Sequence, residues 1–576
     1  MEGTMNKAKH WVQQCSEDHA SSCTQPALFC PSRLVYVGGE SNDKIHIVDM
    51  ITEELSVCIK YTALSHCWGN GVTFKLTTSN HEALAESFDP ADLPLNFQQA
   101  ISATRSLGYA YVWIDSLCIL QDSLEDWAAV SATMGDVYAN AVCTISATAS
   151  DNSQGGCFRK RDRSLEQPFP LLALGGKTLY TWPWTYRQHH LDLEQVFHDK
   201  VETAALSQRA WAFQERLLSR RILHFCEGVV FFECNTMRAT ELSDSAQPYE
   251  RKHYIRYDGR LLAGSDLLHL KADPPKKLKI IIKEANVWFR GRVRRKLKRI
   301  RLIDNPDYLP IKKVKEQLIS QSARIGIRGA LDMLQSLPTT LSLLERIECH
   351  QRWYELVSAY SRRAITHKKD RLIALSGLAR TIQKSTKMKY IAGLWKNTLA
   401  LDLLWTPLKT PSSRPREYIA PSWSWAAIDN GVVSLLSSHS KAVGVDIGTG
   451  MHIEIYIEFL DISVAILGER TFDPASLIDA GHLRISGLTK KASLLSPDFT
   501  PTLIFDGDGD ILDCICLLVY SEQDLPTNKA WWCGLMLRPI HDGPPDLYER
   551  CGVVHGNRPA EWMLVAGWDM RRITII

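Results

Sequence analysis

Several features that would assign a chain to a special class of protein are missing from this sequence. No apolar run approaches the roughly 18 residues of a membrane-spanning helix, and the densest run, Cys514 to Tyr520, has the length of a strand. The N-terminal segment MEGTMNKAKHWVQQ has no apolar core of the kind that signal peptides carry. The sequence also shows no internal repeat and no low-complexity tract. We therefore expect a globular protein with no secretory signal and no membrane span.

The small net charge and the scattered cysteines are typical of a protein that stays inside a cell. The formal net charge is only +3 over 576 residues, which is too small to indicate general affinity for nucleic acid. The 15 cysteines are scattered and odd in number, and without a secretory signal they are best interpreted as reduced thiols. We expect a cytoplasmic protein with no specific nucleic-acid partner. A basic run from Lys276 to Arg301 leaves nuclear import and contact with a membrane surface as alternatives to a solvated helix or an inserted loop.

The patterning divides the chain into four regions. Residues 1–60 form an N-terminal cap with a short helix around Trp11, a cysteine-rich loop and two strands. Residues 61–235 alternate strand and helix patterns, which favours an α/β domain with a mostly parallel sheet. Residues 236–410 are expected to be helical and contain the basic run. Residues 411–576 hold short strand patterns separated by Gly, Pro and Asp turns, which indicates a small β-rich domain.

The stretch from Leu107 to Ala147 carries the clearest signal of the parallel layer. Tyr109 to Ile114 is aromatic and β-branched, as buried strands are, and it ends in Asp115 and Ser116. A polar stretch, a helix pattern and a second strand follow. Open α/β sheets bind ligands at the carboxyl ends of their strands. We therefore expect Asp115 to lie at a site, and capping of the next turn is its alternative role.

A second strand end carries Ser65-His66-Cys67-Trp68-Gly69. A hydroxyl, an imidazole and a thiol at one place can supply a nucleophile and its base. Successive residues of an extended chain point to opposite sides, so these groups converge only if the chain turns sharply, which Gly69 permits. A nucleophilic Cys67 with His66 is one interpretation. A tight turn beside a ligand cleft is the interpretation that we favour.

Two charged residues, Glu215 and Arg216, stand among apolar neighbours in a segment where Ser207 is a plausible helix N-cap. A buried ion pair is costly unless every polar atom in it is satisfied. Such a pair is often architectural, and a functional site is the alternative interpretation of the same two residues.

Cys15, His19 and Cys23 recur every four residues, which places them on one face if the helix continues. Thiolate and imidazole groups suit zinc. The Ser21-Ser22 stretch is typical of a loop, however, and structural zinc sites favour CxxC-like pairs. We expect no metal here and favour a packed cysteine and histidine cap, with zinc as the alternative.

Taken together, the motif blocks resemble the fungal heterokaryon-incompatibility (HET) domain family. The family's Y-x-A-L-S-x-C-W-G block is matched by Tyr61 to Gly69, and its W-I-D-S-L-C-I-x-Q-D block by Trp113 to Asp122. Its D-W pair and the following M-x-x-[IV]-Y-x-x-A are matched at Asp126-Trp127 and at Met134 to Ala141. Its W-x-x-Q-E-R-x-L-S-x-R block is matched by Trp211 to Arg221. Several ordered blocks make this resemblance more specific than any single short motif.

The resemblance implies a role in fungal non-self recognition, in which HET domains trigger programmed cell death after incompatible cells fuse. It also implies a fold, because the HET domain is remotely similar to TIR domains, which are flavodoxin-like α/β signalling modules. We therefore expect an effector or regulator that acts through protein contacts. Its partner would be a second copy of the chain or an incompatibility partner.

The resemblance to TIR domains also implies an alternative function, because some TIR domains cleave NAD with a glutamate at the sheet's carboxyl edge. A carboxylate can stabilise the ribosyl oxocarbenium that forms as nicotinamide leaves. Many family members carry D-W-x-x-E here, whereas this chain has Val130 at the glutamate position. The carboxylates available instead are Glu125, Asp126 and Glu215, and we expect Glu215 and Asp115 as catalytic residues. No cofactor is expected, and NAD would be the substrate.

The remaining residues expected at the site come from the same blocks and would bind the ligand: Ser65, His66, Trp68, Ser116, Trp127, Ser131 and Arg216. A cysteine hydrolase that uses Cys67 or Cys118 with His66 or His224 is the least favoured alternative.

Overall fold

The structure is a computed structural model that describes most of the chain. The described residues are 2–23, 29–38, 44–50, 59–69, 74–159, 169–174, 177–181, 196–241, 247–248, 255–257, 260–262, 327–337, 341, 343–409, 414–415, 417–429, 431–436, 451–466, 478–495, 502–506, 513–524, 529–559 and 567–576. They form one compact unit from Met1–Pro248 and Ala330–Ile576 and a second from Tyr249–Gly329. In the second unit, β12 (Ile255–Tyr257) pairs antiparallel with β13 (Arg260–Leu262). The basic run of residues 276–301 lies outside the described residues.

A nine-stranded mixed sheet organises the N-terminal half of the first unit. Its order is β11-β10-β9-β8-β5-β3-β4-β1-β2, and the central strands β8, β5, β3 and β4 are parallel. The strands at both edges are antiparallel. The bounds are β1 Arg33–Tyr36, β2 His46–Asp49, β3 Thr62–Ser65, β4 Tyr111–Trp113, β5 Cys143–Ser146, β8 Arg221–Cys226, β9 Val229–Cys234, β10 Met237–Thr240 and β11 Gln247–Pro248.

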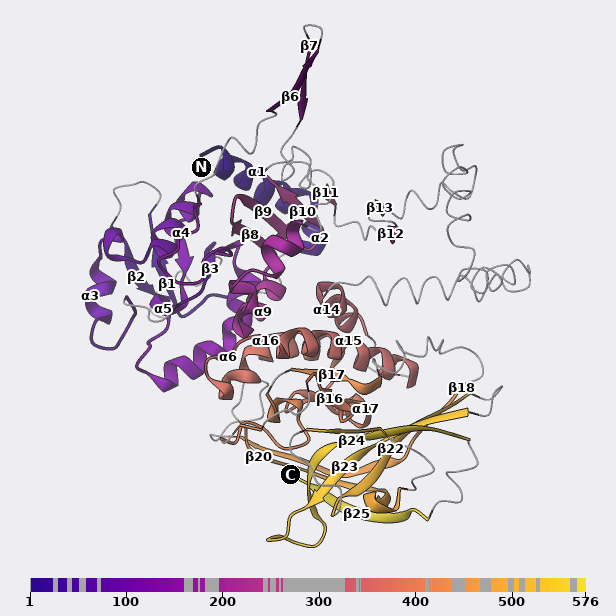
Figure 1. The fold of residues 1–576 in the computed structure, drawn as a ribbon. Coiled ribbons are helices and arrows are strands. Elements are labelled where there is room, and N and C mark those ends of the chain that lie inside the picture. Colours follow the sequence, from indigo (N-terminus) through magenta and orange to yellow (C-terminus); the bar gives the residue numbers. More distant parts are fainter. Residues whose placement is uncertain are drawn as a thin grey trace. The chain divides into compact units, whose positions relative to one another are not determined.

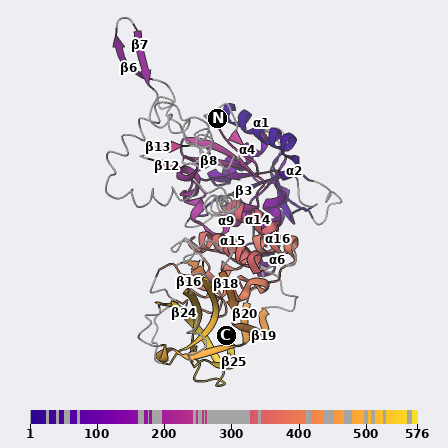
Figure 2. The ribbon, with the colours of Figure 1, turned by 90° about the vertical axis from the view of Figure 1, so that its right-hand side faces the viewer.

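Helices cover both faces of this sheet, which confirms the α/β class. Figure 1 and Figure 2 show α1 and α4 on one face and α6 and α9 on the other. Short helices α2, α3 and α5 connect the strands, and β6 pairs with β7 as a separate hairpin. The bounds are α1 Glu2–Asp18, α2 Ala20–Cys23, α3 His81–Glu86, α4 Leu95–Ser106, α5 Asp115–Cys118, α6 Leu124–Asn140, α9 Ala210–Leu218, β6 Phe169–Leu174 and β7 Lys177–Thr181.

Side chains of β3 alternate between the two faces of the sheet, and helices cover each of these faces. Thr62 Oγ1 lies 2.6 Å from Thr104 Oγ1 of α4. Ser65 points to the opposite face, where its Oγ donates to Glu215 of α9. Since β3 has neighbours on both sides and all four of its residues are buried, the carboxyl end of this strand lies deep in the fold.

The polar stretch before α6 is a helix N-cap. The Ser123 side chain accepts a hydrogen bond from Asp126 N at 3.2 Å, as an N-cap residue does. Asp126 receives two hydrogen bonds from Arg33 at 2.9 and 3.0 Å and one from Leu120 N at 2.7 Å. This stretch therefore sets the start of α6 and ties it to β1.

A second helical layer packs against α6 and α9. Gly135 of α6 meets Gly377 of α16 so closely that a Cβ on Gly135 would lie 2.9 Å from Gly377 Cα. Gly377 N also donates to Gln214 Oε1 of α9 at 2.6 Å. The helices and short strands here are α14 Ile327–Gln335, α15 Leu343–Ser361, α16 Ile373–Thr386, α17 Leu399–Asp402, β14 Tyr390–Ile391, β15 Leu394–Trp395, β16 Trp405–Pro407 and β17 Val432–Ser434.

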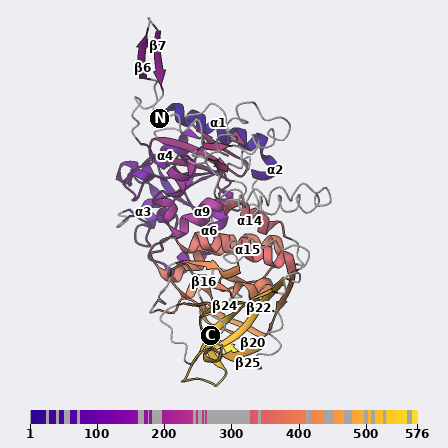
Figure 3. The same cartoon turned by 45° about the vertical axis from the view of Figure 1, so that its right-hand side comes forward.

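The C-terminal region is β-rich, as expected. Its eight strands form one curved sheet, drawn in orange and yellow in Figure 3. Because β20 pairs with both β25 and β22, the strands β22-β23-β24-β25-β20 make a closed ring. The bounds are β18 Met451–Ile455, β19 Ile457–Ile466, β20 Ile478–Lys491, β21 Thr502–Phe505, β22 Ile515–Asp524, β23 Lys529–Pro539, β24 Leu547–Pro559 and β25 Asp569–Ile575.

The described helices contain no candidate for a membrane crossing, because none of them combines the required length with the required apolar character.

Candidate functional site

A buried carboxyl lies against the end of β3. Ser65 Oγ donates to Glu215 Oε2 at 2.5 Å, and the two residues are 5% and 6% exposed. The hydroxyl of Tyr138, which donates to the Leu64 carbonyl at 3.0 Å, also faces Glu215. The Glu215 carboxyl on α9 is therefore enclosed by hydroxyl groups from β3 and α6.

The surroundings of Glu215 favour its protonated form. Burial raises the pKa of Glu215 to about 7, because the charged carboxylate loses its water. Hydrogen bonding from Ser65 and the charge of Arg209 lower this pKa, whereas the negative charge of Asp115 raises it. At neutral pH the group is divided between its acid and its base form, which suits it to accept or release a proton.

Asp115 stands at the neighbouring strand end, directly after β4. Its Oδ2 accepts from Trp68 Nε1 at 2.7 Å, and its Oδ1 accepts from Ser116 N at 2.8 Å. His66 Nδ1 lies 3.8 Å from the same carboxylate. The side chain of Asp115 is 17% exposed, so this carboxylate reaches solvent more than Glu215 does.

His66 is held as a neutral imidazole. Burial lowers its pKa, and Asp115 opposes that shift. Its ring meets Phe97 of α4 edge to face at 5.0 Å, while Nε2 has no hydrogen-bond partner among the described residues. The Arg209 guanidinium donates to the His66 carbonyl, so the start of α9 is fixed to the end of β3.

The turn after β3 depends on glycine. Gly69 has φ +73°, and a Cβ there would lie 2.5 Å from Asn152 Cβ. The next contact, from Ser153 Oγ to the Trp68 carbonyl at 2.9 Å, holds the turn against the loop after β5. The sharp turn that the sequence predicted at Gly69 is present, and it aims Trp68 at Asp115.

We call these residues the strand-end cluster: Ser65, His66, Trp68, Asp115, Tyr138, Arg209 and Glu215. They gather where the order of the parallel strands reverses, since the chain moves from β3 outward to β4 and then crosses back to β5 on the other side of β3. Crevices beyond the carboxyl ends of strands at such a reversal are where open α/β sheets bind ligands. The arrangement combines a titratable buried carboxyl, a second carboxylate, hydroxyl donors and a cation.

Two members of the cluster were not among the expected site residues. In the sequence, Tyr138 occupies one position of the apolar face expected for α6. Arg209 occupies the position before an expected helix. The block patterns carried a signal for both, since Tyr138 lies in M-x-x-[IV]-Y and Arg209 shortly precedes Trp211.

Three expected ligand-binding residues have no side-chain hydrogen bond to the cluster among the described residues. Ser131 Oγ donates to the Ala128 carbonyl within α6 at 3.1 Å. Trp127, nearer the start of the same helix, is half-buried against the core. Ser116 is fully buried, and its Oγ has no hydrogen-bond partner in the described part of the chain.

Arg216 points away from Glu215, so the two do not form the ion pair that the sequence left open. Neighbouring helix positions differ by about 100° around the axis, which sends the two side chains to different surroundings. Arg216 Nε lies 3.0 Å from Glu233 Oε2, and Arg216 Nη2 lies 3.3 Å from Glu202 Oε1. His224 Nε2 contacts the same Glu233 oxygen at 3.1 Å. Arg216 is thus part of a separate network that joins α9 to β8 and β9.

The positions around the start of α6 offer no replacement for a catalytic glutamate. Val130 is 5% exposed and belongs to the hydrophobic core. Asp126 is engaged by Arg33, as described above, and Glu125 is exposed in the first turn. Of the three carboxylates considered as its replacement, Glu215 is the one with a place in the strand-end cluster.

The thiols near the site are poor nucleophiles. Burial raises the pKa of Cys118 to about 12, and burial also raises the pKa of Cys67. His224 is engaged by Glu233. A reactive thiol needs a low pKa, so the contacts do not support a cysteine hydrolase.

A Ser-His-Asp contact also exists between α15, α17 and β17. His350 Nε2 lies 2.6 Å from Ser434 Oγ, and His350 Nδ1 lies 2.8 Å from Asp402 Oδ1. All three residues are at most 1% exposed, so no substrate reaches them. Asp402 also accepts from Trp395 N at 2.8 Å. We assign this group to holding the helical layer together.

Comparison with known proteins identifies the segment that contains the cluster. Residues 61–215 match the family model described as Heterokaryon incompatibility protein (HET). No curated protein and no solved structure matches the chain. Every residue of the strand-end cluster lies inside the matched range, from Ser65 to Glu215 at its end. Residues 61–215 are therefore assigned to the heterokaryon-incompatibility (HET) domain family.

Proposed function

We propose that this protein acts in fungal non-self recognition, as an effector or regulator that triggers programmed cell death through contacts with protein partners. The convergence of the motif blocks carries the proposal. Ser65, Asp115, Tyr138 and Glu215 come from four separate blocks and meet in one place. Burying polar groups together costs desolvation energy, and such clusters are concentrated at functional sites.

Expression in a fungal host tests this proposal. We expect the wild-type chain to slow growth and the Glu215→Gln and Ser65→Ala variants to relieve that defect. Ser65→Ala removes the buried hydrogen bond, and Glu215→Gln removes the carboxyl that can take up or release a proton. Glu227→Gln is the matched control, since Glu227 is 67% exposed on the β8–β9 turn. A wild-type chain that leaves growth unchanged, beside a toxic member of the family, would contradict the proposal.

A second function, cleavage of NAD, is favoured by the position of Glu215. The parallel strands, numbered along the chain, have the order 2-1-3-4, which agrees with the first four strands of the flavodoxin-like order 2-1-3-4-5 and supports likeness to TIR domains. A carboxylate at the reversal point lies where the ribose of a bound nucleotide is expected. This proposal assigns Glu215 to the reacting sugar and Asp115 to its hydroxyl groups.

In this reaction the bond between ribose C1′ and the nicotinamide nitrogen breaks, and its electron pair neutralises the pyridinium. The Glu215 carboxylate stabilises the positive charge that develops on the ribose. Water then adds to C1′ and gives up its proton to Glu215. The products are nicotinamide and ADP-ribose.

Turnover of NAD by the purified full chain tests this chemistry. We expect release of nicotinamide and a loss of roughly a hundredfold or more in Glu215→Gln, the scale of general acid–base catalysis. Glu227→Gln should match the wild type. Turnover that survives in Glu215→Gln would refute the assignment. Absent turnover together with an intact growth defect would favour action through partner contacts alone.

A further inference from the structure

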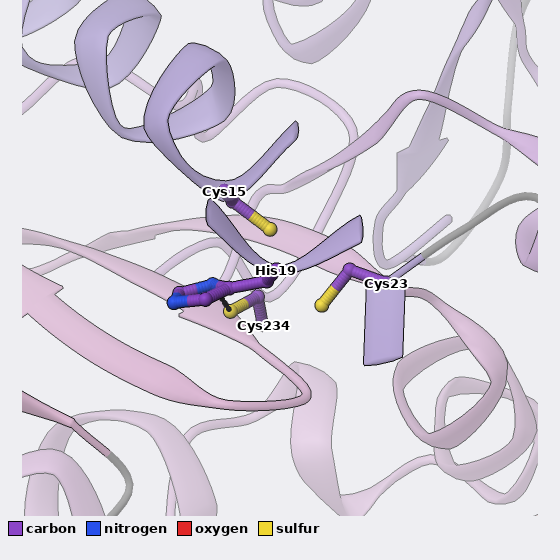
Figure 4. A group of neighbouring side chains, drawn as sticks. All are labelled: Cys15, His19, Cys23 and Cys234. Atoms are coloured by element: carbon purple, nitrogen blue, oxygen red, sulfur yellow. Dashed lines mark hydrogen bonds between the residues drawn. The ribbon is translucent and has the colours of Figure 1, made fainter. Parts of the chain in front are cut away.

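Four side chains that suit a metal ion gather where the N-terminal helices meet the end of β9. Cys15 lies in the last turns of α1, His19 follows that helix, and Cys23 ends α2. Cys234 ends β9, far along the chain. One ligand atom from each lies within 4.8 Å of the others. Figure 4 shows the three sulfurs turned toward one another, with the His19 ring beside Cys234.

We propose that Cys15, His19, Cys23 and Cys234 bind one structural zinc ion. Three thiolates and one imidazole form a ligand set that structural zinc sites use. With Zn–S bonds of about 2.3 Å and a Zn–N bond of about 2.0 Å, a tetrahedral site separates sulfur from nitrogen by about 3.5 Å. Cys234 Sγ and His19 Nδ1 are 3.6 Å apart. The cluster therefore needs little rearrangement to close around the ion.

Hydrogen-bond donors lie against two of the sulfurs. Cys234 Sγ accepts from the backbone N–H groups of Thr236 at 3.4 Å and Met237 at 3.3 Å. Arg221 Nε donates to Cys15 Sγ at 3.1 Å. Donors aimed at sulfur are the second shell that orients and stabilises metal thiolates.

The net charge of the loaded site is also balanced. Three thiolates, a neutral imidazole and Zn²⁺ sum to one negative charge, and the Arg221 guanidinium lies against it. All three cysteines are fully buried. An apolar cap of packed thiols would not require N–H donors and a cation at its sulfurs, which is why the geometry favours a metal over the cap that the sequence favoured.

The fourth ligand could not be found from local spacing. Cys15, His19 and Cys23 are close in sequence, but Cys234 is brought to them by the antiparallel β9–β10 hairpin. A hydrogen bond next to the cluster joins the same two segments, since Asn235 Nδ2 donates to the Ser22 carbonyl at 2.7 Å. The four ligands flank the matched residues 61–215 on both sides. Zinc would thus fasten the segment before the HET domain to the strand after it.

Metal analysis of the purified full chain tests the proposal. We expect about one zinc per chain, and much less in Cys23→Ser and Cys234→Ser. Cys30→Ser and Cys226→Ser are the controls, because Cys30 is half-buried nearby and Cys226 is buried on β8, and neither belongs to the group of four. Both controls should retain the zinc of the wild type.

Reconstitution with cobalt keeps the test informative if the serine variants fail to fold. After removal of zinc, Co²⁺ should give the visible bands of a tetrahedral thiolate site in the wild type. His19→Cys should keep the metal and shift those bands toward an all-sulfur site. Wild-type protein that purifies without metal and takes up neither Zn²⁺ nor Co²⁺ would overturn the proposal. So would a disulfide between any two of the three cysteines in the native protein.

Discussion

Replacement of Glu215 by glutamine should change how the stability of the HET domain depends on pH. In the folded chain, burial raises the pKa of Glu215 to about 7 from an ordinary value of 4.5. The folded state therefore holds this proton in a range of pH where the unfolded chain has already lost it. Glutamine keeps the shape of the protonated side chain and cannot lose the proton.

The sign and size follow from linkage. A carboxyl with a raised pKa contributes stability that is fully present below pH 4.5 and is lost as the pH rises to about 7. At about 1.4 kcal/mol for each pKa unit, the shift corresponds to a loss of about 3 kcal/mol. The stability of Glu215→Gln relative to wild type should therefore rise by about 3 kcal/mol across this range and stay level above it.

Urea unfolding of the full chain, followed through tryptophan fluorescence between about pH 5 and about pH 8, measures this difference. Trp113 packs against Tyr138 with ring centroids 5.6 Å apart, so this part of the fold contributes to the signal. Glu227→Gln is the control and should follow the wild type at every pH. A gap between Glu215→Gln and wild type that does not change with pH would refute the burial and protonation of this carboxyl.

Three further substitutions should change stability without touching the cluster. Arg550→Met removes the fully buried guanidinium that lies 2.5 Å from Asp506 and should cost about 3–5 kcal/mol by urea unfolding; an unchanged midpoint would contradict the buried pair. Lys387→Gly should raise stability by about 1 kcal/mol, because this exposed residue ends α16 with φ 61°; a lower melting temperature would contradict that conformation. Gly377→Ala would place a Cβ 2.6 Å from Gln214 Oε1 and should cost about 1–3 kcal/mol, which thermal melting can detect.

The parallel layer could be predicted because its signals are local. In a sequence, a buried strand is recognised as a short run of aromatic and β-branched residues. The β4 strand (Tyr111–Trp113) lies inside the run that was expected to be a strand. The α6 helix begins after Ser123, whose side chain caps it. Strand ends marked by Ser65 and Asp115 were likewise visible, since each follows an apolar run directly.

Contacts between distant segments could not be predicted in the same way. The antiparallel strands β1 and β2 extend the sheet past the expected boundary near residue 60, because β1 pairs with β4. Asp126 pairs with Arg33 across that boundary, although the sequence left it open as a replacement for the missing glutamate. The face of α9 that meets β3 carries Glu215 and not Arg216. Glu215 therefore enters the strand-end cluster. Only the tertiary arrangement supplies that information.

The same long-range contacts show why the HET domain depends on the rest of the chain. The matched range ends at Glu215, before β8, whose six residues are all buried and which pairs with β5. The α9 helix is fixed from outside the range by the hydrogen bond between Gly377 and Gln214. Without β8, the β5 edge would present unpaired backbone groups, and without α16, one face of α6 and α9 would lose its apolar cover. The Ser65–Glu215 hydrogen bond joins β3 to α9, so its geometry depends on residues that follow the matched domain.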